Sequence, residues 1–257
     1  MNATWNNNQQ YYLRWTRNER TQHWILAVCF IVLAITGFAL RYPEAAWVQP
    51  LLLLEEQFAL RGWIHRIAAL VFVGLGIYHV GYMLFTARGR TLAKALLPVR
   101  QDLDDFWQNV RFLLGRRSAP PPFDHFSYME KIEYWALVWG TVVMAITGFL
   151  LWFEGLALQF LPLWMMEVLT VIHLYEAWLA TLAVMVWHFY SVIFNPEVYP
   201  LNLSMIDGRM SEEEMRREHG RELARLQQAG LETAAQQEQE GEKAKEATSA
   251  VGNAPAV

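Results

Sequence analysis

One apolar stretch, Trp164–Phe194, constrains the fold of this chain most, because it also carries two histidines. An apolar run of about 20 residues or more is typical of a membrane-spanning helix. Ionisable side chains are costly at that depth and need partners there. His173 and His188 are fifteen positions apart, which on an α-helix is about four turns plus 60° and a rise of about 22 Å. Both imidazoles therefore face broadly the same side, one near each face of the membrane.

Three further apolar runs, Trp24–Leu40, Trp63–Phe85 and Tyr134–Phe153, are also long enough to span a bilayer. With 54% hydrophobic residues overall, the chain is predicted to be an all-α, polytopic membrane protein with a four-helix bundle. Residues 1–22 have no basic segment followed by an early apolar core. We therefore expect the first span to serve as an uncleaved anchor.

Basic residues are concentrated on one side of the predicted spans. They cluster before the first span and in the loop 86–131, whereas the other two loops contain few or none. The positive-inside rule then places both termini in the cytoplasm. We predict a cytoplasmic segment 1–22, a four-span domain 23–200 that includes the cytoplasmic loop 86–131, and a cytoplasmic tail 201–257, which is first helical and then disordered.

Two helices are predicted outside the spans. Asp102–Leu114 has the pattern of an amphipathic helix at the membrane interface, with Asp102 capping its start and Gly115 ending it. In the tail, Ser211 and Glu214 form a capping-box pattern for a charged helix over about 211–228. From Ala229 onward the composition favours disorder.

The first and third spans share an internal repeat. The motif AITGF occurs in both, with Gly37 and Gly148 at equivalent places. The second span carries His65 and His79, fourteen positions apart, and the fourth carries its own histidine pair. These patterns indicate a duplicated two-helix unit. The two glycines allow either a flat ring or a neighbouring helix to approach the backbone.

Five histidines lie in or beside the spans, and they fall at two depths. A zinc site needs ligands that converge on one point, and two layers roughly 20 Å apart cannot provide that. Two haems, each held between two imidazoles, fit such layers. The five candidates are His23, His65, His79, His173 and His188.

The chain has a single cysteine, Cys29, inside the first span. This excludes a disulfide framework, a C-x-x-C-H site for covalent haem and a thiolate cluster for iron–sulfur. If haem is present, histidine alone holds it. Nothing in the sequence indicates a nucleophile, a metal-bound water or nucleic-acid binding.

The opening R-x-x-H-W (residues 20–24) followed by TGF, a histidine at the outer end of span two and a histidine pair on span four resemble the dihaem cytochrome b subunits of nickel–iron hydrogenase, formate dehydrogenase and thiosulfate reductase. The resemblance covers about residues 17–200. It implies a cytochrome of the bacterial inner membrane with two b-type haems. His65 and His173 would bind the outer haem, and His23 and His188 the inner one.

The same resemblance implies electron transfer between the quinone pool, as quinone or menaquinone, and a periplasm-facing redox partner. That partner would be an iron–sulfur protein, a hydrogenase-like subunit or a multihaem cytochrome c. On this interpretation the chain is a subunit without catalytic residues of its own. Two alternatives remain: a stand-alone transmembrane reductase of the cytochrome b561 type, and a largely structural membrane anchor.

Two features depart from the family pattern. His79 has no counterpart in the best-known members, and the spacing of fifteen on span four replaces the usual fourteen. His79 is therefore an alternative inner ligand to His23, or a group that binds quinone. Weaker candidates are Arg20, Arg61 and Arg66 for haem propionates, Glu176 near His173, and Glu133 and Tyr134 beside a quinone.

Overall fold

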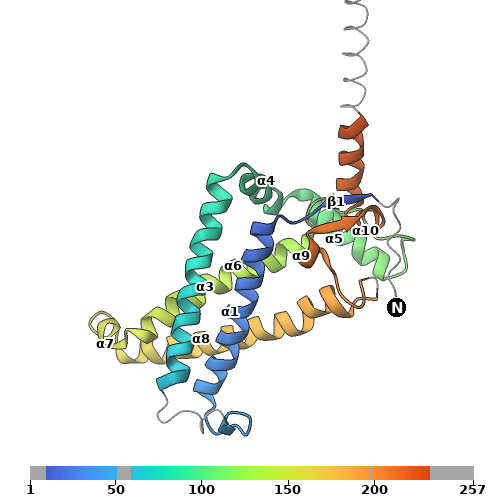
Figure 1. Ribbon diagram of the computed structural model, residues 1–257. Helices are drawn as coiled ribbons and strands as arrows, with labels where there is room; N and C mark the ends of the chain where they lie inside the picture. Colours follow the sequence, from blue (N-terminus) through green and yellow to red (C-terminus); the bar gives the residue numbers. More distant parts are fainter. Residues whose placement is uncertain (1–9, 51–58, 197, 232–257) are drawn as a thin grey trace, which may run out of the picture. The chain divides into compact units, whose positions relative to one another are not determined.

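The computed structural model describes residues 10–50, 59–196 and 198–231. The predicted disorder of the tail falls almost entirely on residues 232–257, which lie outside this range. Four long helices dominate the described part (Figure 1). They are α1 (Arg17–Arg41), α3 (Ala59–Phe85), α6 (Tyr128–Trp152) and α8 (Leu163–Leu182), the last continued by the π-helical segments η1 (Ala183–His188) and η2 (Tyr190–Phe194).

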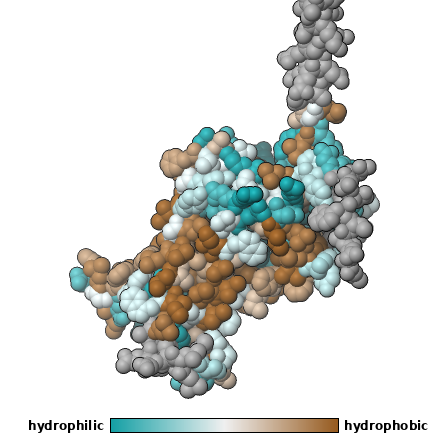
Figure 2. Space-filling view, viewed as in Figure 1, coloured by the Kyte–Doolittle hydropathy of each residue, from teal (hydrophilic) through white to brown (hydrophobic). Residues whose placement is uncertain are grey.

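These helices match the four predicted spans, and each is long and apolar enough to cross a membrane. The all-α membrane architecture is thus confirmed. α1 and α3 run side by side (Figure 1). At most 17% of the residues in the most apolar part of each span are buried inside the protein. Figure 2 shows apolar side chains gathered over the spans. An apolar exterior of this kind is suited to contact with the hydrocarbon of a bilayer and not with water.

Local sequence explains where the spans begin and end. Thr16 caps α1, because its hydroxyl accepts from the Glu19 backbone N–H while the Glu19 carboxylate accepts from the Thr16 N–H at 2.7 Å. α1 ends just before Pro43, and α8 begins directly after Pro162. Proline cannot continue a helix that precedes it but is tolerated at a helix start.

Shorter elements complete the described chain: β1 (Tyr11–Leu13), α4 (Ala87–Leu96), α5 (Arg100–Leu113), α7 (Glu154–Ala157), α9 (Ser204–Asp207), β2 (Arg209–Ser211) and α10 (Glu212–Glu218). β1 and β2 form a two-stranded sheet. The chain divides into two compact units. One holds the spans with residues 13–98 and 129–210, and the other holds residues 99–128 with the segment from 211 onward. The boundaries predicted from the sequence, at residues 22 and 200, separate the membrane-spanning part of the chain from its cytoplasmic parts. They differ in kind from the division into compact units and stay a prediction.

α5 is the predicted amphipathic helix, but it begins two residues earlier than expected. Its N-cap is Val99, and the Asp102 carboxylate accepts from the Val99 N–H at 2.7 Å. Asp102 therefore caps from inside the first turn, as the acidic member of a capping box does. Gly115 follows the helix with a φ of 68°, a left-handed conformation that glycine adopts at low cost.

The tail helix predicted over 211–228 is interrupted. α10 begins after Ser211, whose hydroxyl accepts from the Glu214 N–H as expected. The helix stops at His219, and residues 220–231 form a second helix. The His219 ring bonds to the Asp124 carbonyl oxygen at 2.7 Å. This long-range contact, which no local pattern encodes, coincides with the break.

Ion pairs join the second helix of the tail to residues 99–128 within the same unit. Arg225 bonds both oxygens of Asp124, at 2.6 and 3.0 Å. Burial raises the pKa of the Asp124 carboxyl. This effect is outweighed by the hydrogen bonds from Arg225 and from the His125 N–H and by the charges of Arg225 and Arg221. The pKa of Asp124 therefore lies below the ordinary 3.8. The carboxylate form is thus favoured in the folded unit.

Acidification is expected to loosen this unit at the Asp124 pair. Because the folded pKa is depressed, its stabilising effect is complete above about pH 3.8 and is lost as the pH falls below that value through the folded pKa. Hydrogen exchange over residues 220–231 should accelerate over this interval in the full chain. In Asp124→Asn the acceleration over the same interval should be smaller. An unchanged profile in that variant would contradict the assignment.

Candidate functional site

The first histidine pair joins α3 to α8. The ring centroids of His65 and His173 are 6.5 Å apart. The Nδ1 atom of His65 lies 2.9 Å from the Thr36 hydroxyl, and that of His173 lies 2.8 Å from the Thr147 hydroxyl. The two copies of the AITGF repeat thus hold equivalent rings in the same way.

The threonine contacts determine which nitrogen of each imidazole carries the proton and which has a free lone pair. Each hydroxyl also donates to the carbonyl four residues earlier, at 2.6 Å for Thr36 and 2.7 Å for Thr147. A hydroxyl has one proton, so its oxygen accepts from the histidine Nδ1–H. Nε2 then keeps its lone pair on both rings. This is the tautomer that binds a metal through Nε2.

The glycines of the repeat lie against the same rings. A Cβ atom built on Gly37 would be 3.1 Å from His65 Cε1, and one on Gly148 would be 3.2 Å from His173 Cε1. Such contacts are tighter than ordinary van der Waals contact. Each glycine thus makes room for an imidazole that a neighbouring helix carries.

The second pair joins α1 to η1. The ring centroids of His23 and His188 are 6.3 Å apart, with 42° between the planes. His188 Nδ1 lies 3.3 Å from a carboxylate oxygen of Glu133. His23 Nδ1 is buried and has no hydrogen-bond partner among the described residues. Burying a ring nitrogen that has no hydrogen-bond partner costs folding free energy, unless a ligand or a water molecule binds that nitrogen.

His79 has a different environment. Its Nδ1 lies 2.8 Å from the Gln22 side-chain oxygen and its Nε2 lies 3.1 Å from the Tyr134 hydroxyl. The centroids of the His79 and Tyr134 rings are 5.9 Å apart. Both nitrogens are thus engaged by protein, which favours His23 over His79 as the partner of His188.

The spacing of both histidine pairs fits one metal ion between two imidazoles. A metal–imidazole bond is about 2.0 Å and a ring nitrogen lies about 1.1 Å from its centroid, so two ligands on opposite sides have centroids about 6.2 Å apart. The observed 6.5 and 6.3 Å agree with this arrangement. Among the described residues, no group of three or more His, Cys, Asp or Glu side chains could hold an ion. Each pair offers two imidazole donors, and the remaining ligands of an iron held there would come from a porphyrin.

The π-helical segment η1 (Ala183–His188) explains the unusual spacing on the fourth span. A π turn holds about 4.4 residues, compared with about 3.6 in an α turn. Since the chain becomes π-helical at Ala183, the fifteen residues from His173 to His188 make about 3.9 turns, as fourteen α-helical residues do. The extra residue is absorbed without turning His188 away from the side that His173 faces.

The weaker candidates from the sequence have protein partners of their own. Arg61 Nη1 donates to the Ala39 carbonyl at 2.6 Å. The Arg66 guanidinium lies over Trp152, 5.3 Å from the ring centroid. Arg20 donates to the Ile206 carbonyl. Glu176 lies against Gly140, where a Cβ atom would be 2.8 Å from its Oε1 atom. These arginines have structural roles in addition to any contact with propionates.

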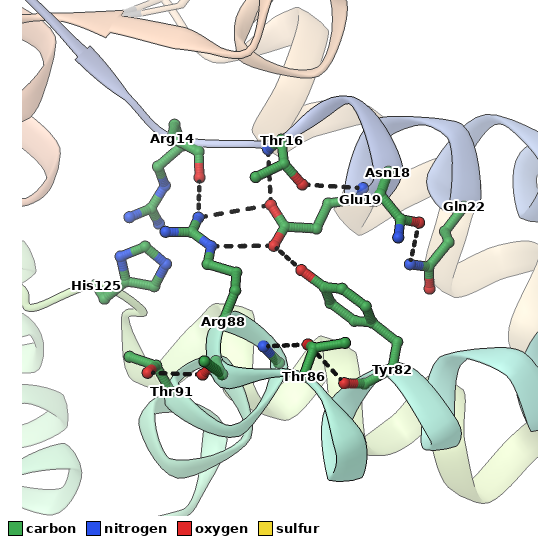
Figure 3. Close-up of polar contacts among 12 residues, drawn as sticks. Arg14, Thr16, Asn18, Glu19, Gln22, Tyr82, Thr86, Arg88, Thr91 and His125 are labelled. Carbon is green, nitrogen blue, oxygen red and sulfur yellow. Dashed lines mark hydrogen bonds and ion pairs between the residues drawn. The ribbon is translucent and has the colours of Figure 1, made fainter.

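A polar cluster that the sequence reasoning missed holds the first turn of α1 to α3 and α4 (Figure 3). The buried Glu19 carboxylate accepts from Arg88 Nε at 3.1 Å and from the Tyr82 hydroxyl at 2.8 Å. Arg88 also donates to the Arg14 carbonyl at 2.8 Å. The T-x-x-E capping pattern at Thr16 was a local signal for Glu19. The cluster fixes the helix turn that leads to Gln22 and His23.

The model of the prokaryotic cytochrome b561 family matches residues 14–208, which include the five histidines in or beside the spans. The chain belongs to this family. Electron transport, b-type haem and multi-pass membrane insertion follow from membership of the cytochrome b561 family together with the four spans. The predicted resemblance is thus confirmed.

The relatives of this cytochrome b561 chain include cytochrome subunits of formate dehydrogenase. The cytochrome b556(fdo) subunit of Escherichia coli K12 is 25% identical over 54% of this chain, and the match spans 60% of its own length. The nitrate-inducible cytochrome b556(Fdn) subunit is 20% identical over 82% of this chain and 89% of its own length. The Haemophilus influenzae cytochrome b556 subunit is 23% identical over about half of each chain.

Proposed function

We propose that this cytochrome carries electrons between an extracytoplasmic redox partner and membrane quinone through two bis-histidine b haems. The observation that supports it most is the pair of imidazole spacings, 6.5 Å for His65 and His173 and 6.3 Å for His23 and His188. When bound, haem supplies reversible one-electron chemistry at iron. The chain supplies the ligands, their tautomers and an apolar surrounding.

Thr36 and Thr147 orient the ligands of the first haem and tune them. Each accepts from an Nδ1–H, which makes the imidazole more basic and favours the oxidised iron. Glu133 lies in the equivalent position beside His188. The two haem sites therefore differ in the charge of their hydrogen-bond acceptors, with a neutral hydroxyl at one and a carboxylate at the other.

The threonine contact gives a measurable prediction. Thr36→Val should raise the midpoint potential of one haem by about 40 mV, since a hydrogen bond is worth about 1 kcal/mol and 59 mV corresponds to a tenfold change in a one-electron equilibrium. A redox titration of the α-band checks this. Thr36→Ser keeps the hydroxyl and should leave both potentials unchanged. If serine and valine shifted the potential equally, the hydrogen bond would not be the cause.

We place the quinone site beside His79 and Tyr134. A polar chain supports it: Asn18 bonds Tyr78 at 2.9 Å, Gln22 bonds Asn18 at 2.9 Å, and Gln22 bonds His79. Quinone reduction takes up protons, and the His79 ring and the Tyr134 hydroxyl, which are hydrogen-bonded to each other, can pass them. The amides of Gln22 and Asn18 orient the His79 ring. His79 lies toward the end of α3, Gln22 lies next to His23 near the start of α1, and Tyr134 lies next to Glu133 near the start of α6.

The relatives' names support a partner enzyme. As a subunit, the chain would receive electrons from, or deliver them to, a periplasm-facing protein such as an iron–sulfur subunit, a hydrogenase-like subunit or a multihaem cytochrome c. The arginine-rich flank of the first span supports cytoplasmic termini in a bacterial inner membrane. The passive anchor and the stand-alone reductase are the competing functions.

A quinol-reduction experiment tests the proposal against both. The full chain is purified in mild detergent, oxidised, and mixed with a menaquinol analogue while the α-band is recorded. Reduction of both haems is expected. A spectrum without a b-type α-band would exclude the haem sites, and a b-type band that quinol leaves oxidised would favour the passive anchor. Co-purification of a redox subunit separates the subunit role from the stand-alone reductase.

A further inference from the structure

An exposed apolar face outside the spans lies on α5 (Arg100–Leu113) and the residue that follows it. Leu103, Trp107, Leu113 and Leu114 are 65%, 59%, 74% and 62% exposed. At about 100° per residue, Leu103, Trp107 and Leu114 lie within about 40° of one another on a helix, and Phe106 and Leu113 extend the same face on one side. Large contiguous apolar faces on a protein surface mark interaction sites.

The opposite face of α5 is fixed to its own unit. The buried Asp105 carboxylate accepts two bonds from Arg221, at 3.0 and 3.2 Å, and one from Gln101 at 2.9 Å. A bidentate arginine–carboxylate pair is directional. It also raises the pKa of the Arg221 guanidinium, chiefly through the hydrogen bond to Asp105. α5 is thereby held against rolling, so its apolar face stays exposed.

Basic residues border the apolar face. On a helix Arg100 and Arg111 lie about 60–80° from Leu103, and both are exposed. Arg116 and Arg117 follow within four residues of the helix end. An apolar face bordered by arginine, with a tryptophan on it, is the arrangement found in helices that lie in the headgroup region of anionic membranes.

The segment just before α5 is attached to a membrane span. Before α5, the Leu96 and Leu97 carbonyls accept from Trp135 Nε1 at 2.9 Å and Lys131 Nζ at 3.2 Å, both in the first turns of α6. α5 therefore begins within a few residues of a point attached to a span. A bilayer is the partner that this attachment keeps within reach.

We propose that α5 binds the surface of an anionic bilayer, with Leu103 and Trp107 inserted at the acyl boundary and Arg100 and Arg111 among the headgroups. Through the Asp105–Arg221 pair, this contact also holds the C-terminal helix 220–231 to the membrane. The inference is independent of the haem and quinone assignments, because it uses no residue of either site.

Spin labels test the depth of this face in the full chain. In a Cys29→Ser background, Leu103→Cys and the matched control Gln101→Cys, on the opposite side of the same turn, are labelled and placed in nanodiscs. One set contains phosphatidylcholine and the other phosphatidylcholine with phosphatidylglycerol. In the anionic discs, the label at 103 should collide mainly with oxygen, and the label at 101 mainly with a water-soluble nickel complex. Elution as a single peak confirms that each variant is folded.

Each other outcome overturns a stated part of the proposal. Nickel access at 103 in both lipids would show that the face lies in water. Protection of 103 from both reagents would show that protein covers it. Equal depth in neutral and anionic discs, or no loss of depth in Arg111→Glu combined with Arg116→Glu, would remove the role of the arginines.

Discussion

His173→Ala is expected to release one haem and leave the other, lowering the content from about two haems per chain to about one. His173 and His65 face each other at 6.5 Å, and removing either leaves one side of the iron without its protein ligand. The pyridine haemochrome assay gives the haem content, and the potential of the remaining haem should not change. Thr170→Val, one turn away on α8, is the control and should retain both haems.

The double variant His65→Ala with His173→Ala sharpens this test. If the two rings hold one iron, the double variant should lose no more haem than either single variant, because residues that act as a unit are not additive. Loss of a second haem in the double variant would contradict the pairing. Full haem content in either single variant would contradict the site itself.

His23→Ala and His79→Ala are expected to have different effects, although the two histidines lie at the same end of the bundle. His23→Ala should release the second haem, because its ring faces His188 at 6.3 Å. His79→Ala should keep both haems, since both its nitrogens bind Gln22 and Tyr134. Quinol-driven haem reduction should nevertheless slow by about a hundredfold, the usual effect of losing a group that transfers protons.

Haem content and stopped-flow reduction by a menaquinol analogue distinguish these variants. Dithionite, which needs no proton transfer from the protein, should reduce His79→Ala as fast as the unaltered chain. Haem loss in His79→Ala would make it an axial ligand and restore the alternative pairing. Unchanged quinol kinetics with full haem content would move the quinone site elsewhere.

Hydropathy alone located the four spans, because a helix that crosses a bilayer needs about twenty consecutive residues that are mostly apolar. The histidine layers were predictable for a similar reason, since ionisable groups are rare at such depths and their spacing along a helix is known. The threonine contacts were not predicted, although AITGF pointed to them. Spacing within one helix does not show that Thr36 on α1 faces His65 on α3.

Other features depended on contacts between distant residues. The preference for His23 over His79 as the inner ligand came from the family resemblance alone. The contacts of His79 were not predictable, because Gln22 and Tyr134 come from two other helices. The break at His219 follows a contact to residue 124, and α4 lay in a segment that looked like a loop. The membrane-facing surface of α5 was visible in its pattern, whereas the Asp105–Arg221 pair on its other face was not.

With haems held by the two histidine pairs as proposed, the π-helical turns of the fourth span would also set the distance that an electron crosses between them. Electron tunnelling slows exponentially with distance, so one more α-helical residue between His173 and His188 would lengthen the gap between porphyrins and rotate one of them. The wider turns of Ala183–His188 take up that residue with little added height. The fifteen residues from His173 to His188 thus keep the two imidazoles at nearly the height and on nearly the side that fourteen α-helical residues would give.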